Sequence, residues 1–202
     1  AGCSQNDVTE KKPDVEKQGT AFVGIKSIKT GASPLSRTSL DYDRVARTLT
    51  YYWEPNDRLF LDDDNSATTE ITAKAARASF IFESGTYNAP NYTVYYTGSN
   101  GTSHNAVTIA TTQTQGTPNT TTHVGTVGDC GTGTATRQSN STYTFTLDHK
   151  ASFICFLPRT TNAAGTGWVL TSIKVTSDNN IAGGYTLSAT GLTGAGVATG
   201  DV

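Results

Sequence analysis

The histidines, serines and acidic residues are the side chains that could carry acid–base, nucleophilic or metal chemistry, and their spacing matches no known site. His104, His123 and His149 form no H-x-x-x-H pair, and the chain has no C-x-x-C pair. It also lacks the G-x-S-x-G turn that would present a nucleophilic serine. The sequence therefore predicts that the protein is not an enzyme and that it has no cofactor and no metal site.

Three polar or glycine-rich runs carry groups that a ligand could use. Asp62–Asn65 offers carboxylate oxygens of the kind that Ca²⁺ prefers, but it lacks the spacing and the glycine of a calcium loop. A solvated turn is the favoured interpretation there, and also for Asp148–Lys150, which lies between two predicted strands. The glycines around Cys130 are not followed by the Lys-Ser/Thr of a phosphate-binding loop.

The three cysteines have different surroundings. Cys3 follows Ala-Gly and precedes Ser, as at the end of a bacterial lipoprotein signal, where a peptidase cuts before the cysteine and its sulfur carries a diacylglycerol. We therefore predict Cys3 to be the lipidation site. Cys130 and Cys155 either form a disulfide, which would stabilise an exported protein by about 3 kcal/mol, or remain a loop thiol and a buried thiol.

Composition limits the classes of partner. The net charge is −2 and charged residues make up only 16 %, so no basic surface for nucleic acid is indicated. No apolar stretch approaches the length needed to span a bilayer. A glycan platform stays open as an alternative to core packing for five rings. They are Trp53, Tyr92, Tyr95, Tyr96 and Trp168.

The chain divides into three parts. Residues 1–19 hold few large apolar side chains, and we interpret them as the lipoprotein start followed by a flexible leader. From 20 to 190, short β-rich runs alternate with turn residues, which predicts an all-β fold, an antiparallel β-sandwich. Residues 191–202 are interpreted as a linker or the truncated start of a second domain. The absence of Met indicates that the numbering begins inside a longer precursor.

Hydrophobic patterning predicts several individual elements. Ala78–Phe82 and Tyr143–Leu147 alternate apolar and polar residues, so each is expected to bury one face. Phe153–Leu157 is apolar throughout, which predicts a central strand covered on both faces. Thr68–Ala78 is the only helix-like window, although its second half also fits a strand. Residues 110–140 are interpreted as a long loop or a pair of exposed polar strands.

The body of the chain resembles the fimbrillin-like surface lipoproteins of Bacteroidales. The resemblance covers most of Thr20–Ala189 and is carried by Leu49–Leu61, Tyr143–Arg159 and Leu170–Ser188. In that family a strand ending in Trp precedes a Gly-Asp or Asn-Asp turn, and an F-x-L-x-H-x-x-A segment and an I-A-G turn follow later. The matching residues here are Trp53, Asn56, Asp57, Phe145, Leu147, His149, Ala151, Ile181, Ala182 and Gly183.

This resemblance implies a transthyretin-like β-sandwich and a structural or adhesive subunit of a cell-surface fimbria, exported as an outer-membrane-anchored lipoprotein. In the family, an arginine-specific protease removes the leader and first strand, and a strand from the next subunit fills the groove. The candidate cleavage residues here are Arg37, Arg44 and Arg47. The implied partners are other fimbrial subunits, the outer membrane through the lipid, and surface ligands of host or bacterial cells.

The removable strand would be Thr20–Ile28, which we predict to pair at an edge of the sandwich. Its alternation places either Ala21, Val23 and Ile25 or Phe22 and Ile28 on the inward face. The alternative function is a stand-alone surface lipoprotein that binds a glycan or another ligand and is not cut.

Overall fold

The fold is that of a computed structural model, which describes residues 19–25, 35–36, 39–43, 48–117, 120–161, 167–194, 196–197 and 199–201. This part of the chain is almost entirely β-structure, so the all-β prediction is confirmed. Its only helix is the single turn α1 (Val124–Val127), and no helix in these ranges is long and apolar enough to cross a bilayer. The strands are β1 (Thr20–Gly24), β2 (Leu35–Ser36), β3 (Ser39–Asp43), β4 (Thr48–Tyr52), β5 (Arg58–Phe60), β6 (Ser66–Thr68), β7 (Ala78–Phe82), β8 (Asn91–Tyr96), β9 (Ala106–Ile109), β10 (Gly131–Arg137), β11 (Tyr143–Phe145), β12 (Leu147–His149), β13 (Lys174–Thr176), β14 (Gly183–Ser188), β15 (Gly191–Thr193) and β16 (Thr199–Asp201).

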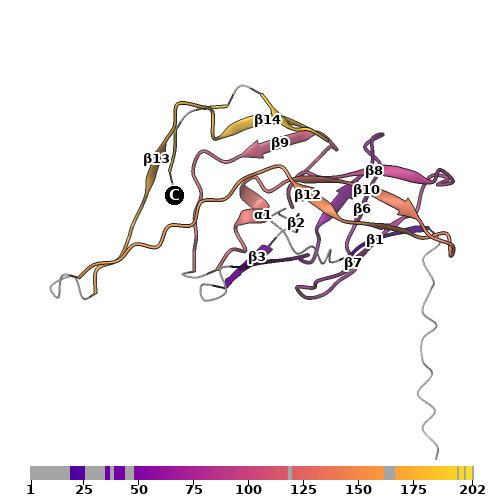
Figure 1. The fold of residues 1–202 in the computed structure, drawn as a ribbon, viewed down its shortest axis with the longest axis horizontal. Helices are drawn as coiled ribbons and strands as arrows, with labels where there is room; N and C mark the ends of the chain where they lie inside the picture. The colour runs from indigo at the N-terminus through magenta and orange to yellow at the C-terminus, as the bar shows by residue number, and fades with distance from the viewer. Residues whose placement is uncertain are drawn as a thin grey trace, which may run out of the picture.

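The main sheet is nearly closed on itself. Its strands follow the order β6-β5-β8-β10-β11-β1-β7, and β12 and β2 branch from β10. A bridge between Thr69, next to β6, and Phe80 in β7 joins the two ends of this path, so we call the sheet the barrel. All pairs along the path are antiparallel except β1 with β11. The barrel occupies the right-hand part of Figure 1.

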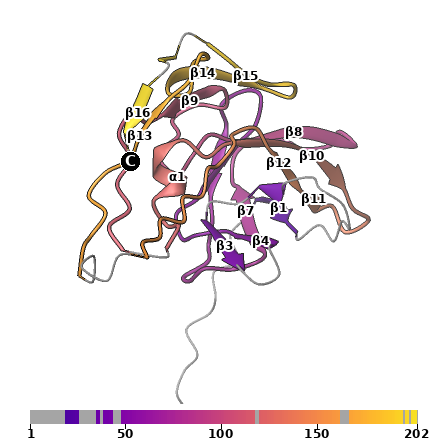
Figure 2. The same ribbon diagram turned by 60° about the vertical axis from the view of Figure 1, so that its left-hand side comes forward.

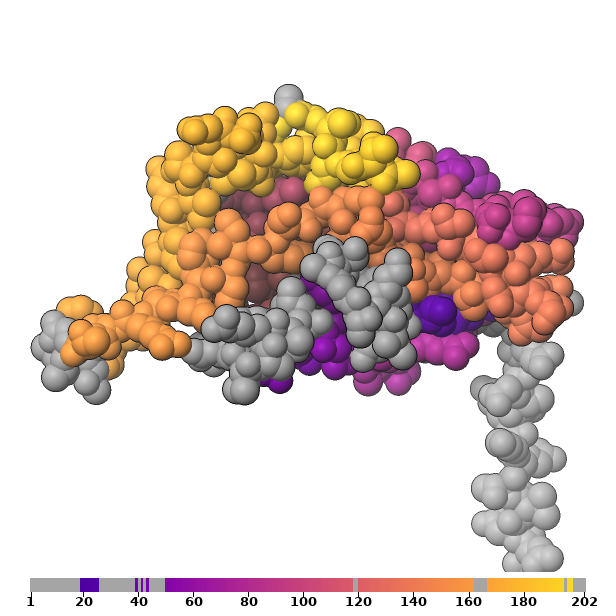
Figure 3. All heavy atoms as spheres, in the orientation of Figure 1, coloured from indigo at the N-terminus to yellow at the C-terminus, as the bar shows by residue number. Residues whose placement is uncertain are grey.

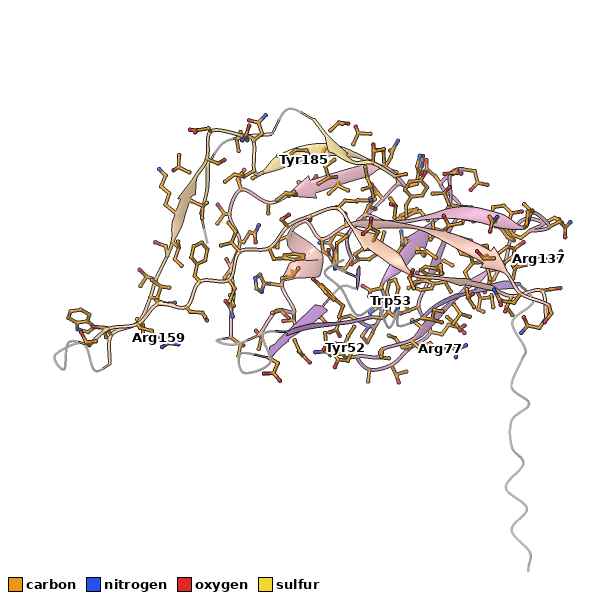
Figure 4. The ribbon with its side chains drawn as sticks, viewed as in Figure 1. Tyr52, Trp53, Arg77, Arg137, Arg159 and Tyr185 are labelled. Atoms are coloured by element: carbon orange, nitrogen blue, oxygen red, sulfur yellow. The ribbon has the colours of Figure 1, made fainter. Side chains whose placement is uncertain are left out.

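A core rich in aromatic side chains fills the barrel. The predicted alternation is confirmed, because Ala78, Phe80 and Phe82 of β7 are buried, and so are Tyr143 and Phe145 of β11. Trp53, which follows β4, lies inside between these strands and packs edge-on against Phe80 (Figure 4).

A smaller layer covers one side of the barrel. Its sheet has the order β15-β14-β9, and Figure 2 shows it at the top of the view. Beneath it Val107, Cys130 and Leu187 form a second, minor core. The hairpin β3–β4 and the pair β13–β16 make up the remaining sheets.

Two local predictions need correction. Thr68–Ala78 contains no helix, because its first residue ends β6, its last begins β7, and sheet pairing outweighs its helix propensity. Residues 110–140 are neither one long loop nor exposed strands, since they contain α1 and β10. Strand β10 is central in the barrel and buries Ala135.

The predicted central strand Phe153–Leu157 is also wrong. Residues 152–161 form no strand after β12 ends, and they run outward with residues 167–173 as a projection, at the left of Figures 1 and 3. We call these two segments the apolar arm. The barrel has no free place for them, because β10 already pairs with β8, β11 and β12, and β11 pairs with β1.

Phe80→Ala should lower the free energy of unfolding by about 3–5 kcal/mol, because it empties the centre of the barrel core. Ile154→Ala, in the arm, should change it by about 0.5 kcal/mol or less. Urea unfolding of both variants in dilute solution measures the difference. Equal losses would contradict the assignment of the core.

Candidate functional site: strand β1 and its slot

Strand β1 lies in the middle of the barrel wall, so its predicted edge position is wrong. Phe22 is opposite Phe80 of β7 on one side and Tyr143 of β11 on the other. In the described chain β7 and β11 pair with β1 and not with each other. We call the place between them, which β1 fills, the β1 slot.

Phe22 is the side chain that fixes β1 in its slot. It is fully buried and stacks on the Tyr143 ring, with the two centroids 4.5 Å apart and the planes at 10°. Phe82, Tyr87 and Tyr92 present their rings at steeper angles, with centroids 4.9, 5.5 and 6.0 Å away. Aromatic pairs in such geometries add about 0.5–1.5 kcal/mol each beyond the area they bury.

The rest of β1 fits the slot equally closely. Val23 is buried as well, whereas Ile25, just beyond the strand, is 36 % exposed and donates its N–H to the Phe145 carbonyl at 3.0 Å. A Cβ on Gly24 would lie 2.7 Å from Trp53 Cζ2, so only glycine fits there without displacing the indole. The predicted inward set Ala21, Val23 and Ile25 is not realised, because Ile25 is exposed. Of the alternative set, Phe22 is buried and Ile28 lies outside the described residues.

The slot has no charge of its own. Strand β1 contains no ionisable residue, and the rings around Phe22 are phenyl or phenol. The Tyr143 hydroxyl donates to the Ala89 carbonyl at 2.7 Å, and burial raises the pKa of Tyr143 above its ordinary value. The slot can therefore accept an extended, uncharged strand, and it offers backbone hydrogen bonds on both sides.

The other predicted site residues fall in two groups. Cys3, Arg37, Arg44 and Arg47 lie outside the residues whose placement or side chains the structure describes. Cys130 and Cys155 are free thiols, the first buried under the second sheet and the second exposed in the arm, so the disulfide that the sequence allowed is not formed. Burial, followed by the charge of Asp129, raises the pKa of Cys130 to about 12.

The five rings weighed against core packing as a sugar platform do not come together on one surface. Trp53 and Tyr96 are buried in the barrel core, whereas Trp168 is exposed in the arm. The acidic run Asp62–Asn65 is a turn, and Asp64 accepts a hydrogen bond from the backbone N–H of His104 at 2.7 Å. Within the described ranges no cluster of three or more His, Cys, Asp or Glu side chains could hold a metal ion.

A buried pair of ionisable side chains, Asp129 and His149, was not expected from the sequence. The sequence places His149 in a polar turn, but it ends β12 with its side chain buried, and its Nδ1 lies 2.9 Å from Asp129 Oδ1. Both side chains are completely buried, and the ring of Tyr51 packs 4.5 Å from the imidazole. The alternation already contained the signal, because His149 continues the inward parity of Phe145 and Leu147.

Burial governs the electrostatics of this pair. It raises the pKa of Asp129 above its ordinary value, and the neighbouring His149 opposes that shift. Burial, together with the charge of Asp129, raises the pKa of Tyr51 to about 12. Both side chains are shielded from bulk solvent, so removal of one leaves the other buried without its partner.

No family model, curated protein or solved structure matches the chain. The β1 slot is therefore the main structural indication of function.

His149→Ala should cost about 3–5 kcal/mol of folding free energy, because Asp129 stays buried without its partner. The matched control is Asp148→Ala on the same strand. Asp148 is exposed, and its contact with Lys150 is a surface ion pair, so the loss should be below about 1 kcal/mol. Denaturant unfolding at neutral pH gives both values.

The double variant Asp129→Asn/His149→Gln separates charge from packing. It replaces both ionisable side chains by neutral amides, so it should recover part of the stability lost in His149→Ala. A double variant less stable than His149→Ala would show that packing, and not the uncompensated carboxylate, dominates at this position.

Proposed function

We propose that the chain is a structural and adhesive subunit of a cell-surface fimbria, exported as an outer-membrane lipoprotein precursor and assembled by exchange of strand β1. The observation that supports this most directly is the position of β1 between β7 and β11. These two strands both pair with β1 and do not pair with each other. A segment near the start of the sequence thus completes the wall of a barrel built from much later residues.

Loss of β1 would leave the domain in need of another strand. It would free the edges of β7 and β11 and expose the aromatic pocket of Phe22. Phe22 and Val23 are both buried, and each such side chain stabilises by about 1.5–3 kcal/mol. A domain without β1 is therefore expected to be marginal and to bind a replacement strand from a neighbouring subunit.

The slot sets the chemistry of that replacement. It needs a large apolar side chain at the place of Phe22 and glycine at the place of Gly24, where Trp53 leaves no room. A charged residue facing the inner pocket would be buried among aromatic rings without a partner.

Lipidation and cleavage fit the same scheme. A lipid on Cys3 and strand β1 both precede Arg37, Arg44 and Arg47, so one cut at any of these arginines separates the body from its anchor and from β1 together. Arg37 is the only one of the three that precedes β3 (Ser39–Asp43). A cut there leaves the β3–β4 hairpin in one piece.

Strand exchange is tested on the Cys3→Ser protein after digestion with an arginine-specific protease. The cleaved protein should bind a fluorescent peptide that spans residues 19–26, measured by anisotropy, and should form larger species on size exclusion. The Phe22→Asp peptide is the matched control and should bind at least about tenfold more weakly, since it loses the aromatic pocket.

The variant Arg37→Gln/Arg44→Gln/Arg47→Gln should not be cut between β1 and β4. It should therefore bind neither the peptide of residues 19–26 nor its Phe22→Asp form. A cleaved protein that stays monomeric, keeps its stability and ignores the peptide would rule out exchange of β1.

A further inference from the structure

The apolar arm exposes more large hydrophobic side chains than any other part of the described chain. Seven of them are between 38 % and 80 % exposed. Clusters of this kind on a folded surface mark contact sites. They are Phe153, Ile154, Phe156, Leu157, Trp168, Val169 and Leu170.

The backbone of residues 152–158 takes part in no described strand pairing, and neither does the rest of residues 152–161 or 167–173. Phe153–Leu157 is apolar at every position, so both of its faces would benefit from cover. One link to the body is the Phe153 ring, which packs edge-on against His149 with the centroids 5.5 Å apart.

The only charged side chain in the described part of the arm is Arg159, which lies beyond the apolar run. There is no ionisable side chain other than Cys155 between Lys150 and Arg159, and none between Arg159 and Lys174. At the sizes usual for large apolar side chains, the exposed parts of the seven residues amount to roughly 700–800 Å² per copy. A stable interface buries roughly 800 Å² on each partner, so two arms supply this area if Trp168, Val169 and Leu170 are covered together with Phe153–Leu157.

We propose that the arm is an interface to a second copy of this chain, formed by antiparallel pairing of residues 152–158 of the two copies. The five-residue apolar run is centred on Cys155, so the register with the greatest apolar overlap places a two-fold axis there. Phe153 then lies opposite Leu157 of the second copy, and Ile154 opposite Phe156. Pro158 closes the pairing, because it has no N–H to donate.

This contact goes beyond the proposed strand exchange. It involves no residue of β1 or its slot, and it needs no cleavage. The uncut chain should therefore dimerise whether or not β1 is exchangeable, and either proposal can fail without the other.

Cys155 reports the register directly. Opposite side chains of an antiparallel pair have their Cβ atoms about 4.5–5.5 Å apart, close enough for a disulfide after a small adjustment. Diamide treatment of the uncut Cys3→Ser protein should therefore give a covalent dimer, with diamide taking up the two electrons and two protons that the thiols lose. Cys3→Ser/Cys155→Ser should stay monomeric on non-reducing gels, because Cys130 is buried.

Ile154→Lys tests the interface without the thiol. Ile154 is 67 % exposed, so the substitution leaves the fold intact, as circular dichroism would verify. It places an unpaired charge among apolar side chains and should reduce both the covalent dimer and the dimer mass seen by light scattering about tenfold or more. Thr161→Lys adds the same charge at an exposed position beyond the apolar run and should change neither.

Three results would overturn the proposal. They are a monomeric mass at high protein concentration, a dimer that survives Ile154→Lys, and a covalent dimer that forms equally well in Ile154→Lys and in the unchanged arm.

Discussion

The packing of Phe22 against Tyr143 is the contact on which the rest of the barrel depends. Through it a short strand from near the start of the sequence joins β7 to β11, and the path of strands from β6 to β7 becomes continuous. The Phe22 ring also packs against Phe82, Tyr87 and Tyr92, so one side chain contributes to both the strand pairing of the wall and the packing of the core. The strand that completes the fold is also the one that the proposed function would remove.

The alternation of apolar and polar residues predicted correctly which face of a strand is buried, but it did not predict which strands pair with each other. Alternation placed Phe80, Phe82 and Phe145 inside, and its continuation to His149 would have revealed the buried pair with Asp129. The edge position of β1 could not be judged, because pairing with β7 and β11 joins segments far apart in the sequence. The central position predicted for Phe153–Leu157 was wrong for a related reason. An apolar run indicates that its side chains favour burial, but it does not indicate which segment or which chain buries them.

The two proposed contacts differ in symmetry. Exchange of β1 is head-to-tail, because a donor strand on one subunit meets a slot on the next, and such contacts propagate into open filaments. Pairing of the arms is isologous and closes after two copies. The slot belongs to the barrel wall and the arm projects away from it (Figures 1 and 3), so the two contacts use separate surfaces. One subunit could extend a filament with the first and connect neighbouring filaments with the second.

The parallel pairing of β1 with β11 also imposes an order on folding during synthesis. Strand β1 leaves the ribosome well before β7, and β11 begins only at Tyr143, so at 5–20 residues per second its second neighbour follows on the order of ten seconds later. Until then Phe22 and Val23 have no completed wall to enter, and the loop that must close is long. The earliest strand of the barrel is thus among the last to take its place, and the barrel cannot be completed before β11 has been synthesised.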